Sequence, residues 1–192
     1  ITFSYGLFRV VGKDALAFAH SVQDVIVLPT QRHDFSYIDV LVACGKYEQV
    51  KKKLLEKLTL AKPTDYELLR VRAGVPVYSI DFTSKNTPLE VDSSAVSFTK
   101  GCYVGQEIVA RLQHIAQAKT PVKLVQLMTF CKEPFTVGTK VYEDDNEIGT
   151  ITSSVYDDKK NVVISLAMLK KPFYELSEVV IGEEKSLLKL LQ

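Results

Sequence analysis

The segment from Ser97 to Arg111 (SFTKGCYVGQEIVAR) holds the residues best suited to chemistry, with Gly101 and Gly105 on either side of Cys102. Glycine permits a positive φ and close backbone approach, so KGCYVG is expected to form a tight loop that feeds a helix starting near Gly105. Such a helix places Cys102 near its N-terminus, where free N–H groups and the helix dipole favour negative charge. With Lys100 nearby, we expect the pKa of the Cys102 thiol to be lowered. The alternative is a cysteine that serves only as a small packed side chain.

Composition limits the classes of function. The chain has 192 residues and a formal net charge of +1, so we expect no direct nucleic-acid partner. It has no run of about 18 apolar residues, so we expect no membrane-spanning helix. The 3 cysteines are far apart and form neither a disulfide framework nor a CxxC metal site. This favours a reducing compartment, the cytoplasm or alternatively the mitochondrial matrix, and we expect no metal site of the chain's own.

The first part of the chain mixes strands and helices. Lys51–Lys53 is expected to lie on a solvated helix face, and Lys62–Asp65, which contains Pro63, reads as a linker. Asp14 is a candidate N-cap for the first helix. The expected elements are a strand at Ser4–Val11, a helix at Ala15–Val22, an apolar run at Asp24–Leu28 that ends at Pro29, a strand at Phe35–Cys44 and an amphipathic helix at Glu48–Leu58.

From Thr120 onward the chain is rich in short strands separated by polar turns. Turns are expected at Asp144–Asn146 and Asp157–Asn161, and evenly spaced strands of this kind are typical of a small closed barrel. We therefore predict an α+β protein with an αβ domain over residues 1–119 and a C-terminal β-barrel over residues 120–192. The expected barrel strands are Val122–Phe130, Thr136–Tyr142, Glu147–Val155, Val162–Leu169 and a last strand within Glu178–Leu191.

KGCYVGQEIVAR resembles the KGCY-x-GQE signature of the YgfZ-type family. These are folate-binding iron–sulfur cluster assembly factors related to the glycine-cleavage T-protein, an aminomethyltransferase. Further blocks agree in order: Leu7–Leu28, more weakly Phe35–Leu58, and Glu67 to about Leu169, with an "LR-x-x-AG-x-P" segment, a "P-x-E" and an "x-x-G-x-x-TS" strand. The resemblance implies a T-protein-like fold, tetrahydrofolate binding and work on iron–sulfur proteins, with a link to tRNA modification.

The resemblance also suggests which residues contact folate. Arg70, in the LR segment, is the first candidate for the glutamate tail, since arginine binds carboxylates through two parallel hydrogen bonds. Arg72, two residues along an expected strand, would share its face, or it is a surface ion-pair residue. Glu90 either pairs with the ligand or accepts a nearby backbone N–H, and Tyr103 either forms a wall of the pocket or packs in the core. Lys100 assists Cys102.

Three roles for Cys102 differ physically: a redox or sulfur-accepting thiolate, one ligand of a transient shared iron–sulfur cluster, or a packed side chain. The resemblance implies that this cysteine matters for cluster work and does not choose between the first two. The favoured function is a folate-binding accessory protein that serves iron–sulfur client or assembly proteins. One alternative is a tetrahydrofolate-dependent aminomethyltransferase, and the other is an interaction module that has lost its ligand. Family members carry further segments between Pro29 and Phe35 and between Leu58 and Tyr66; we expect these segments to be missing from the sequence rather than absent from the protein.

Overall fold

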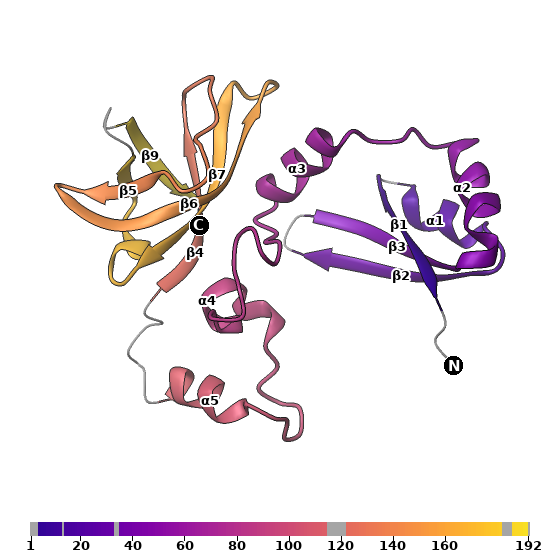
Figure 1. Ribbon diagram of the computed structural model, residues 1–192, viewed down its shortest axis with the longest axis horizontal. Coiled ribbons are helices and arrows are strands. Elements are labelled where there is room, and N and C mark those ends of the chain that lie inside the picture. The colour runs from indigo at the N-terminus through magenta and orange to yellow at the C-terminus, as the bar shows by residue number, and fades with distance from the viewer. Residues whose placement is uncertain (1–3, 13, 33–34, 115–121, 182–185, 192) are drawn as a thin grey trace. The chain divides into compact units, whose positions relative to one another are not determined.

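The computed structural model describes residues 4–12, 14–32, 35–114, 122–181 and 186–191 (Figure 1). The chain divides into two compact units, Ile1–Leu69 and Arg70–Gln192. The sequence placed the division after residue 119. The structure places it earlier because the buried side chains of Arg70 and Val71 belong to the barrel unit, where Arg70 bonds Ser153 and Val71 packs with barrel strands.

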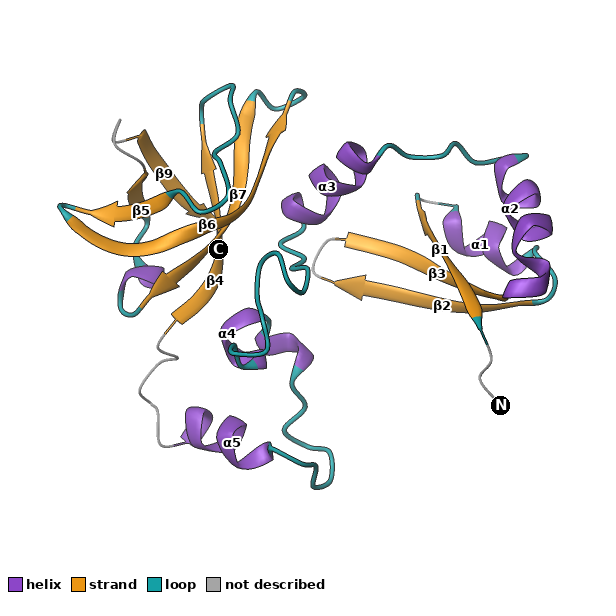
Figure 2. Ribbon diagram, in the orientation of Figure 1, coloured by secondary structure: helices purple, strands orange, loops and turns teal. Residues whose placement is uncertain are grey.

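The first unit is a three-stranded antiparallel sheet with two helices packed on one face (Figure 2). The apolar positions of each strand alternate, so one face carries Val10, Val40 and Val42, which are buried beneath Ala19 and Val50 from the helices. The sheet order is β1-β3-β2. The elements are β1 (Tyr5–Val11), α1 (Ala15–His20), β2 (Val25–Arg32), β3 (Phe35–Ala43) and α2 (Tyr47–Leu55), with a short 3-10 turn at Cys44–Lys46.

Two details of this unit differ from the sequence prediction. The strand expected to end at Pro29 continues to Arg32, because β2 is an edge strand and an edge tolerates a residue without an N–H. The two helices end earlier than predicted, α1 at His20 and α2 at Leu55. The expectation that segments are missing between Pro29 and Phe35 and between Leu58 and Tyr66 stays a prediction, and residues 33 and 34 lie outside the described residues. β2 pairs with β3 as neighbouring antiparallel strands, and residues 56–62 connect α2 to the next helix.

That helix, α3 (Pro63–Arg72), replaces the predicted linker and strand. Proline is well tolerated in the first turn of a helix, and Asp65 accepts the Lys62 N–H at 3.0 Å. Residues two apart on a helix point to different sides, so the prediction that Arg70 and Arg72 share a strand face is wrong.

The second unit is a closed six-stranded barrel in the order β4-β7-β6-β5-β8-β9, which confirms the predicted α+β class and the C-terminal barrel. Its interior holds Leu127, Val141, Ile148, Ile151 and Leu169, all fully buried. The strands are β4 (Val122–Thr129), β5 (Lys140–Glu143), β6 (Asn146–Asp157), β7 (Val162–Lys170), β8 (Glu178–Ile181) and β9 (Ser186–Leu191). The single last strand predicted within Glu178–Leu191 is thus two paired strands.

Two short helices precede the barrel strands in this unit. Helix α4 (Pro88–Val91) packs against β4 and against α5 (Gln106–His114). Val91 of α4 adds to an apolar cluster on the barrel formed by Val71, Leu124, Val162, Ile164 and Leu166. Short 3-10 turns lie at Ser93–Ala95 and Phe173–Glu175. In the part of the chain that the structure describes, no helix is long and apolar enough to cross a membrane.

Candidate functional site: an exposed thiol loop and a buried carboxylate

The predicted thiol loop lies at the surface, between α4 and α5. Cys102 is exposed and is not part of a disulfide. The helix begins at Gln106, immediately after Gly105, whose φ of 86° is a conformation that other residues rarely adopt. This confirms the helix start expected near Gly105, and exposure of Cys102 argues against the packed role.

Hydrogen bonds across the start of α5 hold the last part of the loop. The Tyr103 N–H donates to Oε1 of Gln106 at 3.2 Å, and the Gln106 N–H donates to the Tyr103 carbonyl at 3.3 Å. The Lys100 Nζ lies 4.2 Å from the centroid of the Tyr103 ring, a cation–π contact. The structure therefore brings together two predicted residues of the loop, Lys100 and Tyr103, which flank Cys102 in the chain.

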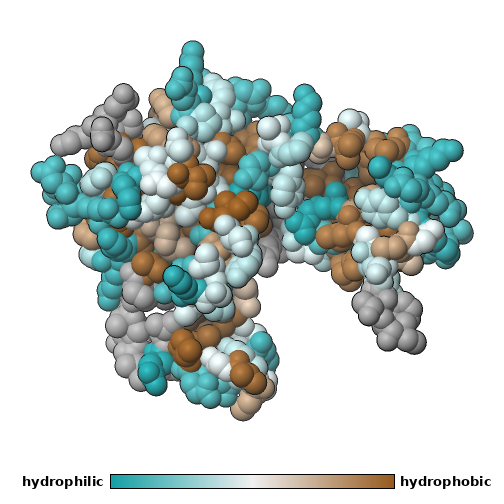
Figure 3. All heavy atoms as spheres, viewed as in Figure 1, coloured by the Kyte–Doolittle hydropathy of each residue, from teal (hydrophilic) through white to brown (hydrophobic). Residues whose placement is uncertain are grey.

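The surface around this thiol is apolar as well as cationic. Phe98, Val104 and Ile108 expose 51%, 103% and 59% of their surface, and Figure 3 shows hydrophobic atoms on the lobe that contains α5 and the loop. In α5 it is Val109 that is buried, at 7% exposed. Large exposed apolar side chains close to a thiol in the chain are suited to a surface that meets another molecule.

Arg70 lies inside the second unit and is fully buried. Its Nη1 is 2.8 Å from Oδ2 of Asp81 and 3.1 Å from the Val75 carbonyl, and its Nη2 donates to the Ser153 hydroxyl at 2.6 Å. A guanidinium bonded in this way has its charge compensated within the protein. The arginine predicted as the first folate contact therefore joins the end of α3 to strand β6.

Asp81 is the centre of this network. Besides Arg70, its Oδ2 accepts the Val77 N–H at 2.9 Å, and its Oδ1 accepts the hydroxyls of Thr152 at 2.7 Å and Ser153 at 2.6 Å. These two hydroxyls come from the TS pair of the resemblance, at the point where β6 shifts register against β7. One buried carboxylate thus connects α3, the loop after it and the barrel.

Arg72 points elsewhere. Its Nη2 forms an ion pair with the buried Asp157, while 34% of the Arg72 side chain remains exposed. Its Nε is buried and has no hydrogen-bond partner among the described residues. Asp157 also accepts backbone N–H groups from Lys159 and Lys160, so this pair fastens α3 to the turn after β6.

Glu90 is buried, with 6% of its surface exposed. Its Oε2 accepts the Thr87 N–H at 2.8 Å, the carboxylate half of a capping box at the start of α4. Of the two roles considered for Glu90, the backbone partner is the one present in this structure.

Comparison with known proteins finds relatives in sequence and a similar fold among solved structures. No family model matches the sequence. An aminomethyltransferase of Aquifex aeolicus is 32% identical over 126 residues, which make up 64% of this chain and 34% of that protein. The crystal structure of glycine cleavage system aminomethyltransferase T from Bartonella henselae has a TM-score of 0.73 and 18% identity, and the match covers 89% of this chain and 49% of that one. The chain is related to the aminomethyltransferase superfamily.

Other relatives in this superfamily carry different names. The tRNA-modifying protein YgfZ of Buchnera aphidicola is 28% identical over 128 residues, 63% of this chain and 40% of that protein. The mitochondrial iron–sulfur cluster assembly factor IBA57 of Mus musculus is 43% identical over 67 residues, 31% of this chain and 19% of that protein. The matches therefore support the superfamily without singling out the YgfZ type, and they span about two fifths or less of these curated relatives.

Sequence reasoning missed two residues that the structure makes prominent. Asp81 was not singled out, although an acid a few residues beyond the LR-x-x-AG-x-P segment, together with the TS pair, was a signal for a buried partner of Arg70. The second is Arg9 in the first unit, which pairs with Asp39 through two contacts of 2.8 and 2.9 Å and donates to the Tyr66 hydroxyl at 2.8 Å. Bonding to Asp39 raises the pKa of Arg9 above its ordinary value.

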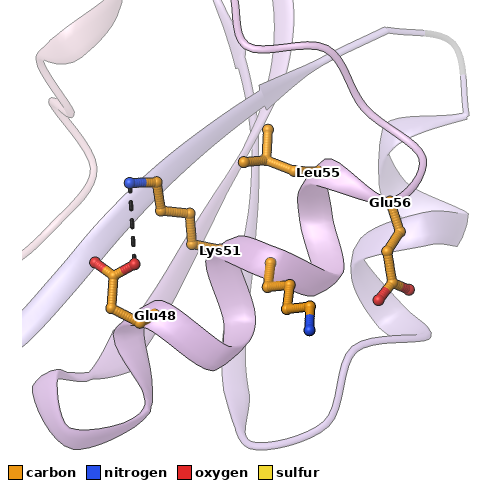
Figure 4. Close-up of a pocket in the computed structure, with 5 residues that line it drawn as sticks. Glu48, Lys51, Leu55 and Glu56 are labelled. Atoms are coloured by element: carbon orange, nitrogen blue, oxygen red, sulfur yellow. Dashed lines mark ion pairs between the residues drawn. The ribbon is translucent and has the colours of Figure 1, made fainter.

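The lysine run Lys51–Lys53 lies on helix α2 of the first unit. Lys51 lies 4.0 Å from Glu48, and the shallow pocket in Figure 4 is lined by residues of α2 and Glu56 alone. This agrees with the prediction of a solvated helix face. Among the described residues, no group of three or more His, Cys, Asp or Glu side chains is arranged to hold a metal ion.

Proposed function

We propose that this protein is a folate-binding accessory factor in the assembly or repair of iron–sulfur proteins, and that Cys102 is its functional thiol. The observation that carries the proposal is the exposed Cys102 in the KGCY loop, which has Lys100 stacked on Tyr103 beside it. A thiol must be reachable to accept sulfur, to undergo redox exchange or to ligate a cluster shared with another protein.

The fit to tetrahydrofolate is partial. Tyr103 offers a half-exposed aromatic ring and Lys100 a cation, which suit the flat and the anionic parts of a folate. Arg72 pairs with Asp157 and keeps part of its side chain exposed. Arg70 and Glu90, which the resemblance suggested as contacts, are bonded within the protein, so in our proposal Tyr103, Lys100 and Arg72 supply the contacts with folate.

The partners follow from the same site. The apolar rim of Phe98, Val104 and Ile108 suits an iron–sulfur client or assembly protein, and a cluster would pass through as cargo. With a net charge of +1 we expect no direct nucleic-acid contact, so any effect on tRNA modification would be indirect. The proposed compartment is reducing, either cytoplasm or mitochondrial matrix.

The second candidate is a tetrahydrofolate-dependent aminomethyltransferase. It is favoured by the relatives of that name, including the Aquifex aeolicus protein at 32% identity. Such an enzyme needs a group that moves a proton at the folate nitrogen. The buried Asp81 is fully engaged by its four donors, so we assign this role to no residue.

A substitution of the thiol separates the candidates. Tetrahydrofolate is titrated by calorimetry into wild type, Cys102→Ala and Cys44→Ala, which removes another exposed thiol. Cluster-dependent enzymes are then assayed in cells whose own copy is replaced by each variant. We expect all three proteins to bind folate, and only Cys102→Ala to lose cluster-enzyme activity. Normal activity with Cys102→Ala contradicts the proposal, and turnover of an aminomethyl donor favours the second candidate.

A further inference from the structure

The loop that contains Cys102 runs from helix α4 to helix α5. The chain leaves α4 at Val91, passes through Cys102 in the exposed loop and enters α5, which packs back against α4. Figure 1 shows this path of the chain, which leaves α4, turns through the loop and continues into α5. The position of the thiol relative to the barrel therefore depends on how α4 is held.

One contact fastens helix α4 to the barrel, and a second stabilises the helix itself. Val91 packs into the apolar cluster on the barrel, next to Leu124 of β4. At the other end, the Glu90 carboxylate accepts the Thr87 N–H at 2.8 Å, while the Glu90 N–H donates to the Thr87 carbonyl at 3.0 Å. A helix of only four residues has few hydrogen bonds of its own, so the bond from the Thr87 N–H to the Glu90 carboxylate contributes a large share of its stability.

We infer that Glu90 is a positioning residue, which holds α4 and thereby the Cys102 loop against the barrel, and that it does not contact folate. Its side chain is directed to the backbone of Thr87 and is 6% exposed, whereas a carboxylate that binds a ligand must present a free edge. The inference rests on the proposed function only for the importance of the thiol; the positioning itself is independent of it.

The two roles of Glu90 predict opposite behaviour of a glutamine substitution. Glutamine serves at this capping position as glutamate does, since its side-chain oxygen accepts the same N–H. A ligand-binding carboxylate, in contrast, loses its charge in Glu90→Gln as fully as in Glu90→Ala. The pair of variants therefore distinguishes a positioning residue from a ligand.

The experiment measures the position of the thiol directly. In a Cys44→Ser, Cys131→Ser background, spin labels are attached to Cys102 and to a Val137→Cys site on an exposed barrel loop. We expect Glu90→Ala to raise the population of loops released from the barrel by about fivefold, the factor that loss of one helix cap typically gives. Glu90→Gln should keep the wild-type distance distribution and the wild-type affinity for tetrahydrofolate.

The same distance measurement on a control variant shows which outcomes would contradict the inference. Glu107→Ala removes an exposed acid from the first turn of α5 and is expected to leave the distribution unchanged. An unchanged distribution in Glu90→Ala, or an equal change in Glu107→Ala, overturns the inference, and so does loss of folate binding in Glu90→Gln. Normal cluster-enzyme activity in Cys102→Ala would instead remove the proposed function and leave the positioning result standing.

Discussion

Neutralising Asp81 should destabilise the barrel unit strongly. In Asp81→Asn the side chain keeps its shape and an oxygen for the hydroxyls of Thr152 and Ser153, but Arg70 keeps a buried charge without its counter-ion. Both side chains of the pair are fully buried, so solvent cannot compensate the guanidinium. Removing one partner of such a pair typically costs about 3–5 kcal/mol, a large part of the roughly 5–15 kcal/mol that stabilises a domain.

The assay has to report the unfolding of the second unit alone. Pulse-labelling hydrogen exchange of peptides from β6 and β7 along a urea titration gives the free energy of unfolding of the barrel. A double variant, Arg70→Met with Asp81→Asn, removes the stranded charge. We expect the free energy of unfolding of this double variant to be about 2 kcal/mol higher than the sum of the two single changes predicts.

A matched control uses an exposed carboxylate. Glu147→Gln removes a solvent-exposed ion pair with Lys140 and should leave the free energy of unfolding of the barrel nearly unchanged. A loss below about 1 kcal/mol in Asp81→Asn would refute the reasoning, since it would mean that Arg70 finds other compensation. So would a double variant that equals the sum of its parts.

Two further outcomes follow from the barrel strands. A Cβ added at Gly149 would lie 2.3 Å from the Met168 carbonyl oxygen, so Gly149→Ala should lower the urea midpoint of the β6–β7 exchange transition by more than Gly101→Ala, where a Cβ meets nothing within 4 Å and φ lies outside the left-handed region; an equal or smaller loss would contradict the close approach. The hydrogen bond from Lys140 lowers the pKa of Glu147, so the pair is formed above the ordinary carboxyl pKa and is lost as pH falls through the lowered one. Carboxyl NMR should therefore give Glu147 a lower midpoint in wild type than in Lys140→Ala, and matching midpoints would show that the pair is absent in solution.

The sequence determined local features well, because they depend on short-range rules. The glycines around Cys102, the helix start after Gly105 and the polar turns between barrel strands are set by backbone conformation and nearest neighbours. Runs of β-forming residues bounded by polar turns were enough to predict β1, β3, β4, β6 and β7, whereas the last predicted strand is two strands, β8 and β9. The glycines of the KGCY motif are enough to predict a loop, whereas they leave open whether the Cys102 thiol is exposed or packed.

Only the tertiary structure decided what the charged residues do. Arg70 and Asp81 are 11 positions apart, and Ser153 lies 72 beyond Asp81, so no local pattern shows that they meet inside the barrel unit. The same holds for the end of α3, which lies with the barrel because Val71 packs there. Whether an arginine faces a ligand or a buried carboxylate depends on which distant strand packs against it, and that is settled by the packing of the whole unit rather than by the residues beside it.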